Sequence, residues 1–303
     1  EAATGEEEAA ETEGMAEVDG PVYNDDGTMT IPEGGSAYGF YDLETNKIID
    51  SGTTIEITDD KLEGSIHFHQ NFSIRRSYIL IILIDYIQHE FYVGGQCFRS
   101  YPFQLEGDIE VYVNISVPIS ESEGHEFAYI IVPNPEIKSY LSNGEYDWDV
   151  MFSDRRLKIG RFNLSKKFQE KEEQEFPANY EIFQAEVNTT GFELVKSREE
   201  PAVCVEGRGG ERLELEVLNQ AEEAEEITYV VMGFADWEQV PVDGEHLKYY
   251  ATVQPGTSVY IPVVLPKVTE PTVFQIIAFS EPDTMLNKYN WDNPTTFRVL
   301  VRP

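Results

Sequence analysis

The sequence predicts an all-β protein made of two tandem β-sandwich domains that are related by internal duplication. Two observations lead to this class. Short strand-like runs separated by turn residues continue from about residue 20 to the end, and four anchors occur twice in the same order. The anchors pair residues 85–88 with 236–239, Tyr101 and Gly107 with Tyr250 and Gly256, Phe127 and 135–136 with Phe274 and 282–283, and 146–149 with 289–292. Their offsets fall from 151 (85 to 236) through 149 (101 to 250) and 147 (127 to 274) to 143 (146 to 289). A repeat of this length matches a whole domain and exceeds the period of solenoids.

The strands are predicted from alternation and from turn residues. Residues 213–217 alternate leucine or valine with glutamate, which is typical of a half-buried strand. Residues 259–263 also alternate, and Pro262 within them predicts an edge strand. The apolar run 78–84 predicts a fully buried strand. Gly94-Gly95 and Asp243-Gly244 follow the two glutamine anchors and predict hairpin turns.

Helix signals are scarce, which decides how the sheets are covered. The best helix candidate is the charged segment 165–175, which we interpret as a briefly helical linker between the domains. A sheet with one apolar face must bury it, and without helices the covering layer is a second sheet. With roughly seven to nine short strands per domain, the strand count and spacing predict an immunoglobulin-like topology. The Cys–Trp–Cys pattern of antibody domains is absent.

The predicted organisation has three parts. Residues 1–19 form a disordered acidic leader, 20–168 the first sandwich, and 169–303 the second sandwich, which begins with the charged linker. The leader holds eight acidic and no basic residues, so it can bury little and repels itself. Such a tract is suited to tethering an exported domain to a membrane or wall anchor; a precursor remnant without a role is the alternative.

Charge limits the partners. The chain has 22 Lys+Arg against 56 Asp+Glu, a formal net charge of −34. This charge repels nucleic acid and anionic lipid and favours cations or cationic surfaces. We interpret it first as a source of solubility in an acidic secreted protein, with a high-salt origin as the alternative. No apolar run reaches the ~18–20 residues of a transmembrane helix. Cys97 and Cys204 are too few for a disulfide scaffold, so two free thiols are expected, with a single bridge between the domains as the alternative.

The repeated Asp-aromatic-x-Gln motif supplies the candidate ligand-binding residues, namely Asp85, Tyr86, Gln88, Asp236, Trp237 and Gln239. One interpretation is a ligand site at the end of each sandwich. The other, which we favour, is structural: the aspartate accepts backbone N–H groups, the ring packs on the sheet, and the glutamine closes the next hairpin. Trp148 and Trp291 are expected to fill the bottoms of the two cores, with sugar stacking as the alternative.

Metal and catalytic chemistry have weaker signals. His67 and His69 lie on one face of a strand with a spacing that zinc accepts, but the second copy does not share them. Asp147 and Asp149 are candidates for calcium, which would stiffen a turn or the junction between the domains. No metal site is expected as part of the shared design. No catalytic residue is assigned, because nucleophile-elbow, phosphate-loop and zinc-protease motifs are absent.

The acidic Ala/Glu-rich leader followed by paired all-β domains resembles exported surface proteins or lipoproteins of Gram-positive bacteria that carry tandem immunoglobulin-like modules. The resemblance implies an extracellular, surface-attached bacterial protein with a lipid or wall anchor upstream, and a non-enzymatic binding or structural role toward a protein or glycan. A tandem carbohydrate-binding module, with coplanar exposed rings, and accessory domains of a secreted enzyme, with a concave pocket, are the alternatives.

Overall fold

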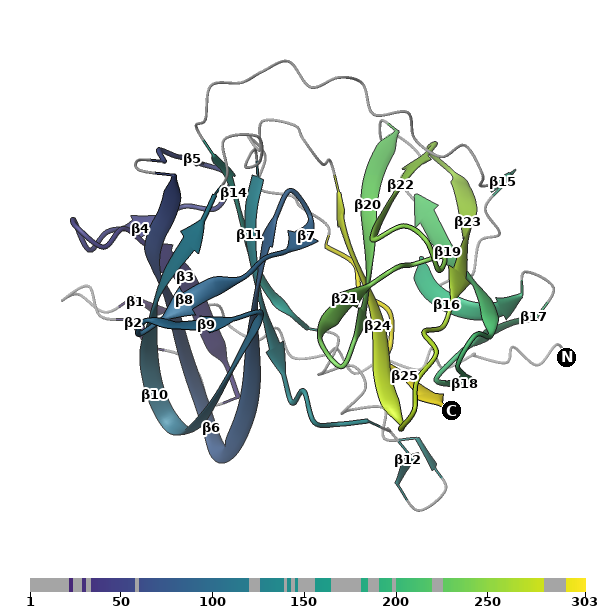
Figure 1. Cartoon of the computed structure of the whole chain (residues 1–303), viewed down its shortest axis with the longest axis horizontal. Coiled ribbons are helices and arrows are strands. Elements are labelled where there is room, and N and C mark those ends of the chain that lie inside the picture. The colour runs from purple at the N-terminus through teal and green to yellow at the C-terminus, as the bar shows by residue number, and fades with distance from the viewer. Residues whose placement is uncertain are drawn as a thin grey trace, which may run out of the picture.

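The computed structural model describes residues 34–57, 60–119, 126–138, 156–164, 191–197, 200–219, 226–280 and 293–303, and the backbone of five short strands outside or between them. Every regular element in these residues is a strand, which confirms the all-β class. The described part of the chain contains no helix long and apolar enough to cross a membrane. The strands form two halves that lie side by side (Figure 1).

The first half is built on two long antiparallel strands, β6 (Lys61–Ile84) and β10 (Ser100–Pro118). The first part of β6 also pairs with β3 (Ser36–Tyr41), and its last part pairs with β11 (Glu126–Pro133). The other strands of this ten-stranded sheet are β4 (Ile48–Ile49), β5 (Thr54–Ile55), β7 (Ile87–Gln88), β8 (Phe91–Val93), β9 (Gln96–Phe98) and β14 (Lys158–Leu164). Side chains from both parts of β6, including Leu62 and Leu80, share one core, so the sheet folds over itself into two layers.

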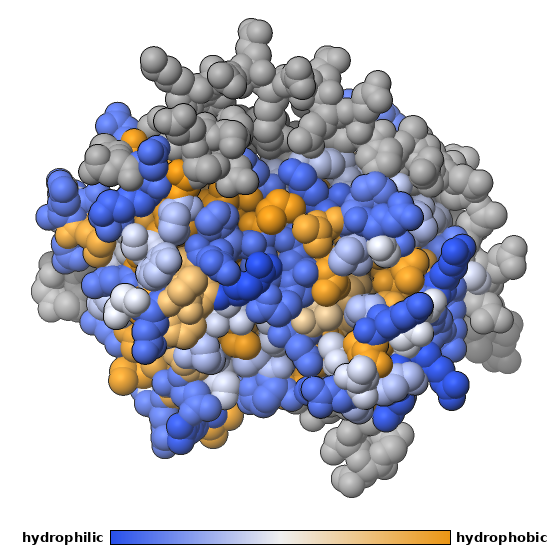
Figure 2. Space-filling model, in the orientation of Figure 1, coloured by the Kyte–Doolittle hydropathy of each residue, from blue (hydrophilic) through white to orange (hydrophobic). Residues whose placement is uncertain are grey.

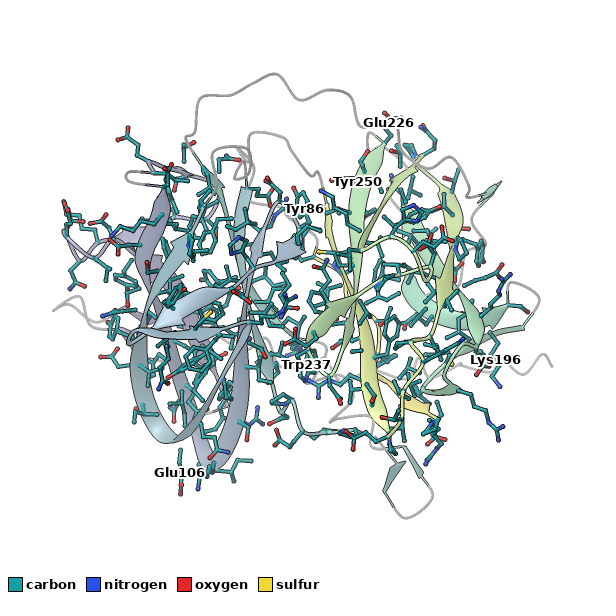
Figure 3. The ribbon with its side chains drawn as sticks, viewed as in Figure 1. Tyr86, Glu106, Lys196, Glu226, Trp237 and Tyr250 are labelled. Atoms are coloured by element: carbon teal, nitrogen blue, oxygen red, sulfur yellow. The ribbon has the colours of Figure 1, made fainter. Side chains whose placement is uncertain are left out.

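The fold-over happens where the β6–β10 register shifts between Leu105 and Gly107. Gly107 has φ 84°, a conformation that glycine adopts without steric cost, and a bulge of this kind bends a strand pair. The bend lies at the far end of the pair from β7, where Figure 3 labels Glu106.

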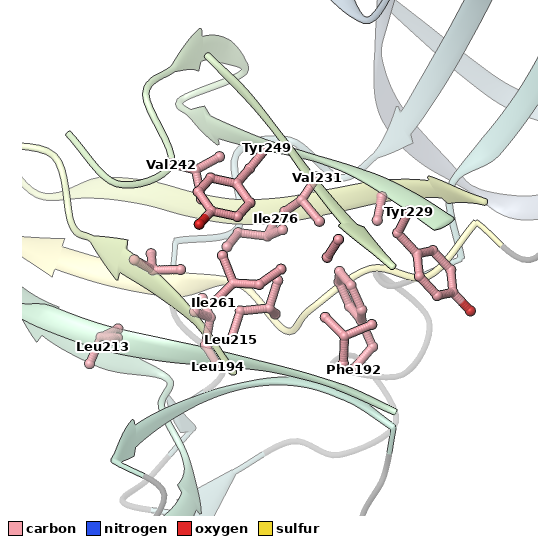
Figure 4. Packing of buried hydrophobic residues seen from close by; sticks show 14 of the residues in the cluster. Phe192, Leu194, Leu213, Leu215, Tyr229, Val231, Val242, Tyr249, Ile261 and Ile276 are labelled. Carbon is pink, nitrogen blue, oxygen red and sulfur yellow. The ribbon is translucent and has the colours of Figure 1, made fainter. Parts of the chain in front are cut away.

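The second half has two separate sheets. One contains β15 (Glu181–Gln184), β16 (Phe192–Ser197), β17 (Glu200–Val203), β19 (Arg212–Asn219) and β23 (Thr257–Val264). The other contains β18 (Glu206–Arg208), β20 (Ile227–Ala235), β21 (Glu238–Val240), β22 (Lys248–Val253), β24 (Thr272–Ser280) and β25 (Val299–Arg302). The predicted alternation of 213–217 is present on its apolar face, where Leu213, Leu215 and Val217 belong to the core between the sheets; Figure 4 labels Leu213 and Leu215 there. The other face is less open than expected, because Glu216 is 4% exposed and accepts from the Tyr260 hydroxyl at 2.9 Å.

The same order of strand pairing occurs in both halves. The first part of β6 pairs with the second part of β10, as β19 pairs with β23. The last part of β6 pairs with the first part of β10, as β20 pairs with β22. Gly107, between the two parts of β10, corresponds to Gly256, between β22 and β23. The remaining counterparts are β3 with β16, β4 with β17, β5 with β18, β7 with β21, β11 with β24, and β14 with β25. Descent of both halves from one duplicated segment stays a prediction.

Three details differ from the sequence-based expectations. Tyr101 lies opposite Leu80, and the residue in the matching place of the second half is Tyr249 opposite Val231, so the Tyr250 anchor is off by one. Gly94-Gly95 forms the β8–β9 hairpin, whereas at Asp243 the carboxylate accepts two backbone N–H groups and no hairpin forms. The strand β23 has neighbours on both sides, although β15 pairs only with Thr257 to Tyr260 and stops short of Pro262.

Several predictions lie outside the described residues. These are the 1–19 leader, the boundary at 168/169, the helical linker, Trp148 and Trp291, and the anchors around them. Four two-residue strands, β1 (Val22–Tyr23), β2 (Met29–Thr30), β12 (Leu141–Ser142) and β13 (Glu145–Tyr146), are placed by their backbone alone. Cys97 is exposed and Cys204 is buried, and both are free, as expected.

A third apolar cluster lies between the halves. Every residue of β11 and of β24 is buried, because one face of each strand packs into its own sandwich and the other packs against the opposite half. The cluster consists of Ile81, Leu83, Tyr86, Ala128, Ile130 and Val132 from the first half, and Val230, Met232, Phe234, Trp237, Tyr250, Val273, Ile277 and Phe279 from the second. Burial on both faces explains why these strands are nearly continuous apolar runs, with Gln275 as an internal polar residue of β24, instead of alternating ones.

Candidate functional site

The six residues of the repeated motif all lie at the junction of the halves. Tyr86 is 1% exposed, and Gln88 and Trp237 are each 3% exposed. Figure 3 shows Tyr86 and Trp237 between the two halves. The structure therefore brings together two motifs that lie about 150 positions apart in the sequence. The sequence-based interpretation had placed a separate ligand site at the end of each sandwich.

Each motif begins as a tight two-residue turn. Asp85 and Tyr86 have φ of 50° and 66°, and Asp236 and Trp237 have φ of 42° and 71°. Two positive φ values are the mark of the type I′ turns that match strand twist, and aspartate tolerates them better than most residues. The aspartate side chains hold the turns to the neighbouring strand: Oδ1 of Asp85 accepts from the Glu126 N–H at 2.9 Å, and Oδ1 of Asp236 from the Val273 N–H at 2.9 Å.

The two glutamines then bind each other, in an arrangement that we call the glutamine clamp (Gln88 and Gln239). The Gln88 backbone N–H donates to Oε1 of Gln239 at 2.7 Å, and the Gln239 N–H donates to Oε1 of Gln88 at 2.6 Å. Their side-chain amides also cross over: Nε2 of Gln88 donates to the Trp237 carbonyl at 3.0 Å, and Nε2 of Gln239 to the Tyr86 carbonyl at 2.9 Å. Reciprocal contacts of this kind are those of a two-fold, self-complementary interface.

Two buried arginines extend the same reciprocity. Nη1 of Arg161 donates to the Ser280 carbonyl at 2.7 Å, from the first half to the second. In the opposite direction Arg298 donates to the carbonyls of Pro133 and Asn134, at 2.6 Å each. The guanidinium carbon of Arg298 also lies 4.9 Å from the centre of the Trp237 ring, within the range of a cation–π contact.

A buried ion pair completes the first half of the junction. Arg161 and Glu126 have side chains 0% and 3% exposed and are joined at 2.8 Å, and the Tyr86 hydroxyl donates to the same carboxylate. Burial alone would lower the pKa of Arg161, but Glu126 and Tyr86 together outweigh it and raise that pKa, so the guanidinium stays charged. The charge is retained because it has a carboxylate and a carbonyl as partners.

The rim of the junction carries weaker contacts. Arg99 binds Glu238 at 2.8 Å, and both side chains are 47% exposed. Exposed pairs of this kind contribute little to stability. The motif residues thus hold the two halves together, and the side chains of Tyr86, Gln88 and Trp237 are buried while the halves are joined. Asp236 differs, because its side chain is 44% exposed and lies 3.4 Å from Nζ of Lys138. A ligand-binding role for the six residues stays a prediction, and for the three buried ones it requires the halves to separate.

The glutamine clamp makes a testable prediction about coupling. Gln88→Ala and Gln239→Ala are each expected to lower the free energy of unfolding by about 1–3 kcal/mol, because each leaves buried amide groups without partners. Since each glutamine serves the other, the double variant is expected to lose less than the sum, with a coupling of about 0.5–3 kcal/mol. Urea denaturation of the four chains measures this. Strict additivity would show that the clamp contributes nothing as a pair.

A second feature lies on the outer face of the β3–β6–β10 part of the first half. It consists of three rings, Tyr41, His67 and Tyr112, with His69, Asp108 and Glu110 beside them, and we call it the ring patch. The His67 ring lies 4.7 Å from Tyr112 and 5.6 Å from Tyr41 between ring centres, and the two tyrosines lie 5.8 Å apart at 77°. Tyr112 is nevertheless 50% exposed.

Strand register explains why these residues meet. His67 lies opposite Tyr112, and His69 opposite Glu110, so alternate residues of the two strands share one face. The sequence indicated only the His-x-His pair of this patch. Its tyrosines and carboxylates were not predicted, because they meet the histidines through pairing between strands about 40 residues apart.

Hydrogen bonds join the histidines of the patch to its carboxylates. Nε2 of His67 lies 3.2 Å from Glu110, and Nε2 of His69 lies 2.7 Å from Asp108. Burial lowers the pKa of His67 and outweighs the opposing effect of Glu110, so His67 is neutral at neutral pH. In the part of the chain that the structure describes, no group of three or more His, Cys, Asp or Glu residues could hold a metal ion. Asp147 and Asp149 lie outside it, and calcium binding stays a prediction.

The lowered pKa of His67 predicts a pH dependence of stability. In the unfolded chain His67 binds a proton once the pH is below its usual pKa of 6.5, whereas in the folded chain it stays neutral to a lower pH. The free energy of unfolding therefore falls as the pH drops from about 6.5 toward the lower folded pKa. His67→Gln is expected to reduce this loss between pH 7 and pH 5, measured as the difference in urea midpoint. An identical pH profile in the variant would contradict the assignment. His89→Gln, in the link between β7 and β8, is the control.

Comparisons with known proteins show structural likeness alone. No family model matches it, and no curated protein does. Solved structures that resemble it include the C-terminal domain of the Streptococcus agalactiae antigen I/II polypeptide BspA, at 10% identity and a TM-score of 0.24 over 88% of this chain and 100% of that one. The C-terminal domain of the Streptococcus pyogenes antigen I/II-family protein AspA matches at 8% identity and a TM-score of 0.25, over 88% and 99%. The calcium-binding domain CBD12 of CALX1.1 matches at 12% identity and a TM-score of 0.21, over 88% and 99%. Likenesses this distant support no shared function or ligand.

Proposed function

We propose that this chain is a non-enzymatic binding or structural protein of a bacterial cell surface, with the ring patch as its contact face. The observation that carries the proposal is the ring patch itself. Three aromatic rings gather on the outer face of the sheet, where Tyr112 covers the buried His67 and stays 50% exposed itself. Exposed aromatic groups of this kind mark contact surfaces more often than isolated apolar residues do.

The junction supports the structural side of this role. The glutamine clamp and the buried arginines join two sandwiches into a unit whose contacts run in both directions. Glu126 and Arg161 bind each other within this junction, so neither is placed to act as a general acid or base. On the face drawn in Figure 2, hydrophilic side chains predominate and apolar ones form separate patches. The acidic leader 1–19 would hold this unit away from a lipid or wall anchor.

A carbohydrate-binding module is the second candidate, and the exposed Tyr112 beside two carboxylates favours it. A flat sugar ring stacks best on a continuous platform, however, and the Tyr112 plane is inclined by 34° to His67 and by 77° to Tyr41. This geometry favours a protein partner over a glycan. A role as accessory domains of a secreted enzyme is the third candidate.

Surface exposure can be tested through the two thiols. On intact cells that produce the chain, a membrane-impermeant maleimide is expected to label exposed Cys97 and to leave buried Cys204 unlabelled. Cys97→Ser is the matched control and should lose the label. Labelling that appears only after the cells are broken would contradict a surface location.

The partner class can be tested on a glycan array that includes cell-wall material. We expect no signal that depends on the ring patch. A glycan that binds the natural chain and Tyr92→Ser but not Tyr112→Ser would establish the carbohydrate function instead, because Tyr92 is a comparably exposed tyrosine outside the three-ring cluster.

A further inference from the structure

We infer that the ring patch binds lysine or arginine side chains of a basic protein segment. The inference rests on the proposed binding function and names the chemistry of the partner at the same face.

The rings supply the first half of the recognition. The face of a tyrosine ring attracts a cation that lies within about 6 Å of its centre. Tyr112 packs against His67 at 4.7 Å and is still 50% exposed, so a large part of its ring remains open to a partner. Tyr41, at 5.8 Å and 77° to Tyr112, fixes the orientation of that ring.

The carboxylates supply the second half. Asp108, Glu110 and Tyr112 are alternate residues of β10 and therefore point to the same face. The side chains of Asp108 and Glu110 are 65% and 56% exposed. Each is hydrogen-bonded to a histidine. Burial lowers the pKa of His67, so this imidazole is neutral at neutral pH and leaves the negative charge of Glu110 in place.

The cations on the strands around the patch have other partners. Neither β3 nor β10 contains a lysine or an arginine, and Lys61, at the start of β6, binds Glu63 at 2.9 Å. The other two cations of β6 lie near the bend, where Arg75 donates to Gln104 and Arg76 covers the Phe72 ring. The whole chain carries a net charge of −34, which adds long-range attraction for a basic partner. Charge complementarity thus points to one occupant.

The spacing along β10 further defines the partner. Alternate residues of an extended strand are about 7 Å apart on one face. A segment that lies along β10 in extended form, with basic residues at alternate positions, would present one cation to Tyr112 and the next to Glu110 or Asp108. The inferred partner is therefore an extended segment with alternating lysines or arginines.

The test is a binding titration of the intact chain with a short synthetic peptide in which lysine alternates with serine, followed by calorimetry or thermophoresis. Tyr112→Ser is expected to weaken binding by about 3- to 10-fold. Glu110→Gln is expected to weaken it by about 2- to 5-fold and to reduce its salt dependence.

The matched controls are Tyr92→Ser and Glu106→Gln. The latter makes the same charge change on the same strand, at the bend. Both controls are expected to bind like the natural chain. A peptide with glutamate in place of lysine is expected not to bind.

Equal weakening in the patch variants and in their controls would overturn the inference, because general attraction to an acidic chain would then explain the binding. Failure of the lysine peptide to bind, together with a glycan signal that needs Tyr112, would overturn the basic partner but keep the ring patch as the contact face. If the peptide or a glycan binds with the same affinity to every patch variant as to the natural chain, both the inference and the proposed contact face are overturned.

Discussion

Arg161→Met is expected to lower the free energy of unfolding by about 3–5 kcal/mol, the cost of breaking a buried ion pair by removing one partner. Glu126 would keep a carboxylate that is 3% exposed with its cation removed, and the Ser280 carbonyl would lose the donor that reaches it from the opposite half. Methionine approximates the length of the side chain, so most of the loss comes from the charge and the hydrogen bonds. Urea denaturation followed by circular dichroism measures the change.

The control for this prediction is Arg99→Met, at the exposed rim of the same junction. Arg99 binds Glu238 at 2.8 Å across the halves, but both groups are about half exposed, and a loss of at most about 1 kcal/mol is expected. The double variant Arg161→Met with Glu126→Leu removes both charges and is expected to be more stable than Arg161→Met alone. Similar losses for Arg161→Met and Arg99→Met would show that the buried pair is not what holds the junction.

Trp237→Ala is expected to lower the free energy of unfolding by about 3–5 kcal/mol and to separate the unfolding of the two halves. The indole packs in the cluster between the halves, its Nε1 donates to the Pro135 carbonyl at 3.1 Å, and Arg298 covers its ring. Without it the cluster between the halves loses its largest side chain, while the core of each sandwich is expected to stay intact. Units that lose their coupling unfold in separate steps.

Differential scanning calorimetry tests the second part of this prediction. We expect one transition in the natural chain and two in Trp237→Ala. The control is Tyr92→Ala, where the ring is exposed and a change within about 0.5 kcal/mol and a single transition are expected. A single, unshifted transition in Trp237→Ala would contradict the view that the junction couples the halves.

The junction shows how far the motif could be interpreted from sequence. Repetition of Asp-aromatic-x-Gln indicated that the positions matter, and the aspartate was correctly expected to accept backbone N–H groups. The glutamines were expected to close the hairpins that follow them, and each does donate within its own half, Gln88 to the Arg99 carbonyl and Gln239 to the Leu247 carbonyl, both at 3.1 Å. What the expectation missed is that each also binds the other half. The chemistry of a glutamine is the same in both cases, so its type does not reveal which chain segment it meets.

The apolar runs held more information than the prediction used. Residues 78–84 were correctly expected to form a buried strand, and the neighbouring β11 and β24 are buried along their entire length. A strand that covers one core needs apolar residues at every second position only. The nearly continuous apolar runs of β11 and β24 therefore indicated a second apolar partner for each sheet, and that partner is the other half of the chain.

The class of fold and the positions of many strands and turns follow from the sequence, because alternation and turn chemistry act between residues that are close along the chain. Only the tertiary structure decided that the sheets meet back to back, that Gln88 reaches Gln239, and that Tyr41, His67 and Tyr112 share one face. Those contacts depend on register and on which faces pack together, and both are set by the burial of all the strands at once.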